Sequence, residues 1–318
     1  MGIEDEGHEI ETTEGRGVSR RGLIVQGGLL AAGLTAFGGM GSSEAFAAGK
    51  TTKIAVVTHG DTGSFWSVFK NGVDQAGKDL KARGVSITQV YANNDISKQV
   101  AGINAAIAAK VNVIATSVPS ADALKDPLTS ASSKGIEIIT VNSGEGTFDS
   151  LPTYDVHVGQ NEKIAGQGAG QQFNAAGAKS VVVIIHEASN SGLTDRAAGV
   201  KSTFKGTTKT LLIPNAKADI PGMTAKVSAY FKANPSTDAL LGLDPDVTVP
   251  AAGVAPSGTK VGTFDVSAPV IKALEAGKML FAIDQQQYLQ GYLPVVFSVL
   301  FVNNLNTVGG GKPVLTGP

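Results

Sequence analysis

The chain has 318 residues, with 26 Lys and Arg against 27 Asp and Glu, which gives a formal net charge of −1 at pH 7. A nearly neutral chain without long runs of one charge gives no electrostatic reason to expect binding to nucleic acid or to an anionic membrane. It contains no cysteine, which excludes disulfide bonds and a lipid-modified cysteine.

The first 47 residues have the pattern of an export signal. A polar, acidic start is followed by Arg20-Arg21, by a stretch rich in Gly and Leu that ends near Met40, and by Ala45-Phe46-Ala47. A charged region, an apolar region and an A-x-A site are typical of a secretory signal, and the paired arginines resemble a twin-arginine signal. A transmembrane anchor is the alternative, but glycines interrupt the apolar stretch and its downstream flank is not positive. We expect cleavage near Ala47 and no membrane anchor.

Apolar runs alternate with helical segments after residue 50. Short apolar runs predict buried strands, and apolar residues three and four apart predict helices. In chain order the predicted strands are Lys53–Thr58, Val85–Tyr91, Val111–Thr116, Ile136–Val141, Tyr154–Gly159, Ser180–Ile185, Thr210–Ile213, Ala239–Leu243, Lys260–Phe264 and Leu280–Asp284. The predicted helices are Phe65–Arg83, Ser97–Ala109, Ser120–Lys134, Asn161–Ala176, Asp195–Phe204, Pro221–Asn234, Pro269–Gly277 and Tyr288–Val308.

This alternation predicts an α/β fold with parallel sheets that are covered by helices on both faces. The pattern starts again after residue 159, so two α/β units of similar make-up lie in tandem. The cluster Gly166, Gly168 and Gly170 does not follow a tight strand turn, and we interpret it as a helix face that packs closely against a neighbour.

Polar and aromatic residues follow the predicted strands. In open parallel sheets, ligands bind just outside the carboxyl ends of the strands. Phe65 and Trp66 are adjacent at the start of a helix, where neighbours point about 100° apart, so at least one of them is expected to face a cleft. The other strand ends carry Asp61, Ser117, Asn142, Ser143, His186, Glu187, Asn190, Asp244, Asp265 and Gln285, with Arg196 early in a helix. An apolar platform with amide, hydroxyl and carboxyl groups suits a neutral polyhydroxylated ligand.

Other roles for these residues stay open at this point. Arg196 could pair with Asp195 or another acid, and Asn190, Asp244 and Asp265 could cap helices. Asp244 and Asp265 could also be the carboxyl pair of a glycoside-acting enzyme.

Enzyme motifs are otherwise missing from the sequence. The chain has no G-x-G-x-x-G after the first strand, no phosphate-binding loop and no G-x-S-x-G elbow. The histidines after residue 47 lack metal-ligand spacing. We therefore expect no enzymatic activity, no metal and no cofactor.

Residues 50–318 resemble the periplasmic sugar-binding proteins of ABC importers, of the ribose-binding type. The segments that carry the resemblance are Phe65-Trp66 with Gly72, Thr140–Gly144, His157–Asn161, Asp195–Gly199, Gly262–Asp265 and Phe281–Gln286. The resemblance implies the type I periplasmic binding protein fold, in which two Rossmann-like lobes joined by a three-strand hinge close on a sugar. Residues 48–158 and 286–308 would form lobe one, and residues 159–285 and 309–318 lobe two, with crossings near Gly159, Gln285 and Gly309–Gly311.

The resemblance also implies ligand-binding roles for particular residues, to which the strand-end pattern adds Asn190. They are Phe65, Trp66, Asn142, Ser143, Arg196, Asp244, Asp265 and Gln285. The sequence departs from the ribose-binding pattern at Gly63, Asn142, Ser143 and Asp244, and at Ile220, where an aromatic often closes the site. As the ligand, another pentose, a hexose or a sugar alcohol therefore fits the sequence as well as ribose does.

The function expected from the resemblance is that of an exported, monomeric periplasmic protein that delivers a small carbohydrate to a membrane ABC permease. A receptor for chemotaxis or quorum sensing and a glycoside-acting enzyme are the alternatives. A transcriptional regulator with the same core is disfavoured, because the chain has an export signal and no basic helix-turn-helix segment.

Overall fold

The computed structural model describes residues 51–60, 63–147, 151, 154–305 and 312–318, all within the compact unit Phe46–Pro318. The predicted signal 1–47, Asp61 and the crossing predicted at Gly309–Gly311 lie outside the described residues. Within these described ranges, no helix combines the length and the hydropathy that a membrane span would need.

Lobe one is built on a parallel sheet with the strand order β11-β5-β4-β3-β1-β2. Its strands are β1 (Thr52–Thr58), β2 (Val85–Tyr91), β3 (Val113–Thr116), β4 (Glu137–Val141), β5 (Tyr154–Gly159) and β11 (Val314–Leu315). Its helices are α1 (Gly63–Asp79), α2 (Ile96–Ala108), α3 (Ala121–Ser133) and α9 (Gln287–Asn304), with short 3-10 turns at Lys81–Arg83 and Glu145–Thr147.

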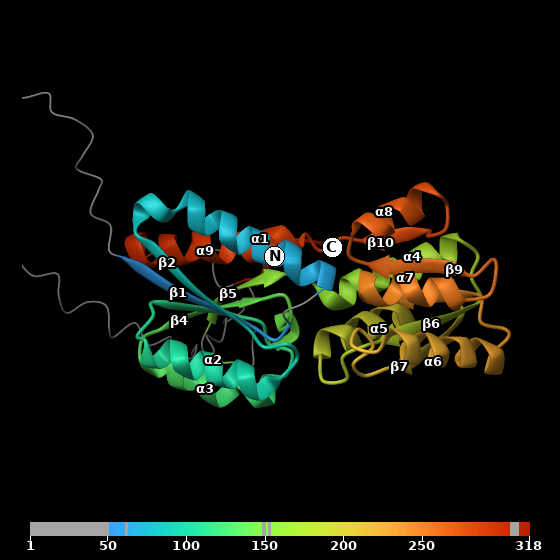
Figure 1. Ribbon diagram of the computed structural model, residues 1–318, viewed down its shortest axis with the longest axis horizontal. Coiled ribbons are helices and arrows are strands. Elements are labelled where there is room, and N and C mark those ends of the chain that lie inside the picture. Colours follow the sequence, from blue (N-terminus) through green and yellow to red (C-terminus); the bar gives the residue numbers. More distant parts are fainter. Residues whose placement is uncertain (1–50, 61–62, 148–150, 152–153, 306–311) are drawn as a thin grey trace, which may run out of the picture. The chain divides into compact units, whose positions relative to one another are not determined.

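Both faces of this sheet are covered. Helices α1 and α9 cover one face, and α2 and α3 cover the other (Figure 1). Ile54 and Val56 of β1 pack with the first pair, whereas Ala55 and Val57 pack with the second. A parallel strand that is buried on both faces needs an unbroken apolar run, which explains why these strands were predictable.

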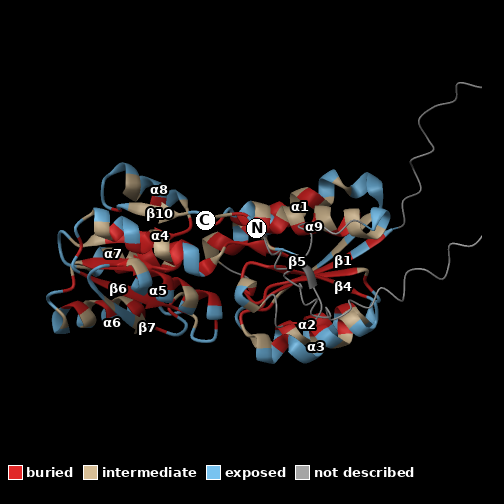
Figure 2. Cartoon of the chain, turned by 180° about the vertical axis from the view of Figure 1, so that it is seen from behind, coloured by how far each residue is buried: buried red, intermediate tan, exposed pale blue. Residues whose placement is uncertain are grey.

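Lobe two repeats the plan with the strand order β10-β9-β8-β6-β7, again all parallel. Its strands are β6 (Ser180–Ile185), β7 (Thr207–Leu212), β8 (Ala239–Gly242), β9 (Lys260–Phe264) and β10 (Phe281–Ile283). The helices α4 (Glu162–Ala175) and α5 (Ser191–Thr203) cover one face, and α6 (Ile220–Ala233), α7 (Pro245–Val254) and α8 (Ala268–Glu275) cover the other. Figure 2 shows the inner strands β6, β8 and β9 buried between helices whose outer faces are exposed.

The two sheets share one connectivity, in which the first strand lies between the second and the third. The chain therefore reverses its direction of winding between β1 and β3 and again between β6 and β8. At such switch points the loops at the carboxyl ends of the strands diverge and leave a crevice. The predicted fold class of two α/β lobes with parallel sheets is confirmed.

Helices α4 and α5 pack closely against each other at glycines of α4. A Cβ atom on Gly166 would lie 2.1 Å from the carbonyl oxygen of Arg196, and one on Gly170 would lie 2.4 Å from Oγ1 of Thr203. The predicted close-packed helix face is confirmed for these two glycines. It is wrong for Gly168, because a Cβ there would have no neighbour within 4 Å.

Helix α7 and the start of helix α5 differ from the predictions. Helix α7 was not predicted, because Pro245 and Pro250 break its pattern, yet Pro245 occupies the first helical turn, where its missing N–H costs nothing. Helix α5 begins at Ser191 rather than Asp195, because the side chain of Asn190 accepts a hydrogen bond from the backbone N–H of Gly192 and caps the helix.

The C-terminal tail also differs from its prediction. Residues 309–318 are predicted to belong to lobe two, but β11 pairs with β5 in the sheet of lobe one. Thr316 in this tail forms hydrogen bonds to two of the segments where the chain crosses from one lobe to the other. Its hydroxyl donates to the carbonyl oxygen of Gln285 at 2.8 Å, and its backbone N–H donates to that of Gly159 at 2.7 Å.

Candidate ligand-binding site

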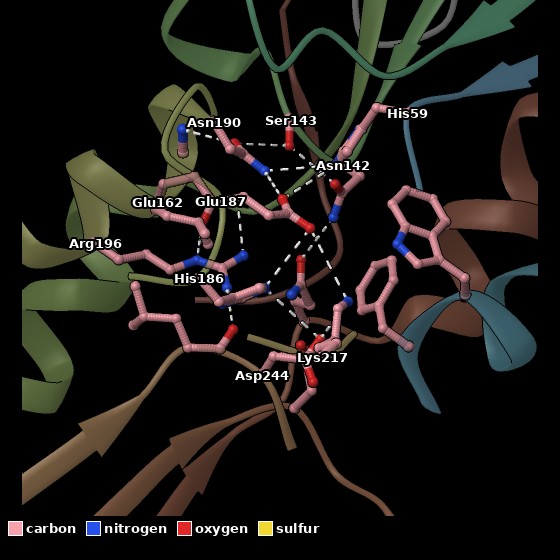
Figure 3. A pocket seen from close by; sticks show the side chains of 17 residues that line it. His59, Asn142, Ser143, Glu162, His186, Glu187, Asn190, Arg196, Lys217 and Asp244 are labelled. Carbon is pink, nitrogen blue, oxygen red and sulfur yellow. Dashed lines mark hydrogen bonds and ion pairs between the residues drawn. The ribbon is translucent and has the colours of Figure 1, made fainter. Parts of the chain in front are cut away.

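The carboxyl ends of the two sheets line a common cavity (Figure 3). The structure brings all of the predicted site residues together in its wall: Phe65, Trp66, Asn142, Ser143, Asn190, Arg196, Asp244, Asp265 and Gln285. His59, Glu162, His186, Glu187 and Lys217 line it as well. We refer to it as the primary cavity.

The aromatic side of the primary cavity comes from the first two turns of α1. The rings of Phe65 and Trp66 meet edge to face with their centroids 4.9 Å apart, and the indole also meets the ring of His59 at 5.1 Å. Both side chains belong to the core of lobe one and line the cavity as well. The pair is therefore held rigidly by packing, as a stacking platform should be.

A buried ion pair holds the arginine of lobe two. Arg196 donates from Nε to Oε2 of Glu162 at 2.5 Å and from Nη2 to Oε1 at 3.1 Å, and its guanidinium lies 4.4 Å from the centre of the Phe264 ring. Burial alone would lower the pKa of Arg196, but the charge of Glu162 raises it above its ordinary value. The alternative pairing with Asp195 is wrong. Glu162, the first residue of α4, was not among the predicted site residues.

Asp244 is both a helix cap and part of the cavity wall. Its Oδ1 accepts from the backbone N–H of Asp246 at 2.7 Å, which caps α7, and its Oδ2 accepts from Nζ of Lys217 at 3.1 Å. Lys217 was missed, and it reaches the cavity from the loop after β7. Ile220, which the resemblance places opposite the aromatic platform, does not line the cavity.

Charges of both signs therefore face the cavity in pairs. Burial by itself would lower the pKa of Lys217, but Asp244 and Glu187 raise it above its ordinary value. Burial would raise the pKa of Glu187, yet the neighbouring His59, His186 and Lys217 lower it well below its ordinary value.

Amide side chains form the end of the cavity near the crossing segments. Nδ2 of Asn142 donates to Oε1 of Gln285 at 3.3 Å, and the hydroxyl of Ser143 donates to Oδ1 of Asn190 at 3.2 Å. These contacts join groups of both lobes. Asn142 adopts a left-handed backbone conformation, with φ of 58°. Asparagine enters this region more readily than most other non-glycine residues.

Asp265 is also left-handed, with φ of 65°, and its carboxyl group is almost completely buried. Its Oδ1 has no hydrogen-bond partner among the described residues. Burial raises the pKa of Asp265 to about 8, although Arg196 opposes the shift. The alternative role of Asp265 as the cap of α8 is wrong, because Ser267 takes that place. A buried carboxyl oxygen without a partner is ready to bind a hydroxyl group.

The two lobes touch around the primary cavity. Nε2 of His59 lies 3.6 Å from Oε2 of Glu187, and the backbone N–H of Ser191 donates to the carbonyl oxygen of Pro119 at 3.2 Å. The cavity measures about 30 Å³, far below the volume of about 300 Å³ at which small-molecule pockets begin. A sugar ring therefore enters only when the facing side chains or the lobes move apart.

Two parallel-sheet lobes with polar side chains converging between them define a ligand-binding protein of the two-lobed type. Residues 54–302 match the periplasmic binding protein domain, and the chain belongs to this family. A carbohydrate transporter protein from Acidothermus cellulolyticus 11B, solved in complex with myo-inositol, is 32% identical, with a TM-score of 0.79 over 84% of this chain and 92% of that chain.

Two relatives whose names state a ligand are also similar to this chain. The xylose/arabinose-binding protein XylF of Sulfolobus acidocaldarius is 26% identical over 79% of this chain, and a xylitol-binding protein of Mycolicibacterium smegmatis is 32% identical over 45% of it. The chain spans 66% and 40% of the lengths of these two relatives.

Proposed function

We propose that the protein is the substrate-binding component of an ABC transporter and that it captures a small, neutral carbohydrate or polyol between its lobes. The observation that carries the proposal is the placement, across one cavity, of the Phe65–Trp66 platform opposite the unpartnered Oδ1 atom of Asp265. The relatives support this class of ligand, because their names refer to pentoses, xylitol and myo-inositol.

The paired charges favour a neutral ligand. Arg196 is engaged by Glu162, and Lys217 by Asp244 and Glu187, so neither cation is free to bind an anionic group. A sugar acid or sugar phosphate would have to break these pairs, which leaves buried charges uncompensated at a large cost in free energy. Hydroxyl groups can instead join the network as both donors and acceptors.

Binding couples to movement of the lobes. The platform and Asn142 belong to lobe one, whereas Arg196, Asp244 and Asp265 belong to lobe two, so a ligand that contacts both sets stabilises the closed form. Shifting the equilibrium from 1:99 to 99:1 requires that the ligand favour the closed form by about 5.5 kcal/mol. A wrong ligand leaves buried polar groups unpaired, which provides the discrimination.

The last step of the proposed function is delivery of the ligand to a membrane permease. The N-terminal pattern of residues 1–47 supports export by a twin-arginine signal that is cleaved near Ala47, with the mature protein acting as a periplasmic monomer on a membrane permease. Membership of the periplasmic binding protein family supports the same compartment.

A thermal-shift screen followed by calorimetry tests the function. The panel contains D-ribose, D-xylose, L-arabinose, D-glucose, xylitol and myo-inositol, with D-glucuronate and glucose 6-phosphate as anionic counterparts. We expect saturable binding of a neutral member without turnover and no binding of the anionic members. Asp265→Ala should abolish the shift, and Asp219→Ala, which changes a helix cap outside the cavity, should keep it. Turnover, or no binding by any neutral member, contradicts the proposal.

A further inference from the structure

A second cavity of about 280 Å³ adjoins the primary cavity. Lobe one contributes Ile96, Pro119 and Ala123 to its wall, and lobe two contributes Ser189 and Pro214. It is far larger than the primary cavity and approaches the size of about 300 Å³ at which small-molecule pockets begin. We call it the outer cavity.

The wall between the two cavities is one layer of side chains. His59, His186, Glu187 and Asn190 line both cavities. Asn190 donates from Nδ2 to Oε2 of Glu187 at 2.8 Å, and Nε2 of His59 lies 3.6 Å from the same oxygen. Ser117 holds His59 from the far side, where its hydroxyl oxygen lies 2.7 Å from Nδ1. These polar contacts can be exchanged for contacts to a ligand that passes between the cavities.

The outer cavity has a different chemistry from the primary cavity. Apart from the residues of the shared wall, none of the residues that line it is ionisable. Proline and aliphatic groups supply C–H surface, and the side chains of Asn94 and Asn215 supply amide groups. A neutral ring with C–H faces and a hydroxyl rim matches this lining, because its faces can contact the prolines and its rim the amides.

We propose that the outer cavity is an extension subsite that holds the second ring of a neutral disaccharide or glycosylated polyol, whose first ring occupies the primary cavity. The inference rests on the proposed function, since the first ring is the carbohydrate or polyol bound there. The glycosidic linkage passes beside His59 and Glu187, where it replaces part of their contact.

Calorimetry with matched ligand pairs tests the subsite. The pairs are D-xylose with xylobiose, D-glucose with cellobiose and with maltose, and myo-inositol with galactinol. In at least one pair, the two-ring member should bind ten-fold or more tightly than its one-ring partner. If one-ring ligands bind and no two-ring ligand binds more tightly, the subsite is overturned while the proposed function stands. If no ligand binds, both fail.

Two variants separate the outer cavity from the primary one. Ala123 is exposed on the first turn of α3, and Ala123→Trp should fill the outer cavity. It should weaken the two-ring ligand at least ten-fold and change the one-ring ligand less than two-fold. Ala105→Trp, on the exposed face of α2 and outside both cavities, should change neither. Equal weakening of both ligands by Ala123→Trp overturns the subsite. Tighter binding of n-butyl β-D-xyloside than of every disaccharide also overturns it, in favour of an alkyl group.

Discussion

Oδ2 of Asp246 in lobe two accepts a hydrogen bond from the backbone N–H of Ser64 in lobe one, at 2.8 Å. Asp246 lies in the first turn of α7, and Ser64 lies in the first turn of α1. One carboxylate therefore serves the N-termini of two helices, where negative charge is stabilising. Gly63 permits the approach, because its φ is 95° and a Cβ atom there would lie 2.5 Å from the same oxygen. The contact exists only while the lobes are together.

Removing this contact should favour the open form. Asp246→Ala deletes one hydrogen bond between the lobes, of a type that contributes about 1 kcal/mol at a helix N-terminus. We expect a loss of affinity of about three- to ten-fold for the best ligand, measured by calorimetry, and a larger radius of gyration in X-ray scattering without ligand. Asp219→Ala removes the cap of α6 within lobe two and should lower stability alone. Equal affinities of both variants would refute the role of Asp246.

The contact between α4 and α5 should be sensitive to a single methyl group. Gly166→Ala forces α5 away from α4 at Arg196, so we expect a loss of about 1–3 kcal/mol in unfolding free energy and weaker ligand binding. Gly168→Ala, two residues along the same helix, meets nothing and should stabilise the protein by about 0.4–1 kcal/mol. Urea denaturation measures both, and matching results for the two variants would show that the close approach has no consequence.

Asp265 should make the ligand-free protein less stable as the pH rises. Its pKa is about 8 in the folded protein and 3.8 ordinarily, so between these values the folded state binds a proton that the unfolded state has released. Stability therefore falls from pH 4 to pH 8. Asp265→Asn removes this dependence and tolerates the left-handed backbone. The variant should melt a few degrees higher than the parent protein at pH 8, and the gap should close towards pH 4. A gap that is independent of pH would contradict the raised pKa.

Trp66 should report ligand binding, because it is the one tryptophan of the chain and lines the primary cavity. We expect a saturable change in its emission whose midpoint agrees with the calorimetric Kd. A reporter moved to Tyr230→Trp in a Trp66→Phe background lies on α6, away from the cavity, and should give no change at ligand concentrations that saturate this variant by calorimetry. A silent Trp66 in a protein that binds ligand by calorimetry would place the platform outside the site.

The strands and the strand-end residues were predictable for the same physical reason. Strands covered on both faces need unbroken apolar runs, and parallel connectivity brings their carboxyl ends to one edge, so Asn142, Asp265 and Gln285 could be placed together from their positions alone. Their binding roles stay predictions. Glu162 and Lys217 could not be found this way. The position of Glu162 in the cavity depends on how α4 packs against α5, and that of Lys217 depends on the course of the loop after β7.

The helix ends and the tail were harder for a different reason. The start of α5 depends on the side-chain cap of Asn190, and the two-residue strand β11 has too short a pattern to detect. Tertiary contacts decide such short elements, and the sequence pattern carries little of that information.

Because the two sheets share one strand order, corresponding loops of the two lobes line the binding cleft. His59 follows β1 and His186 follows β6, and these strands are counterparts in the two sheets. Asn142 and Asp265 likewise follow the counterpart strands β4 and β9, and both have left-handed backbones. A ligand is thus contacted by similar loops from both lobes. The orientation of the ligand in the cleft is therefore set only where corresponding loops carry different side chains, as with the amide of Asn142 and the carboxyl group of Asp265.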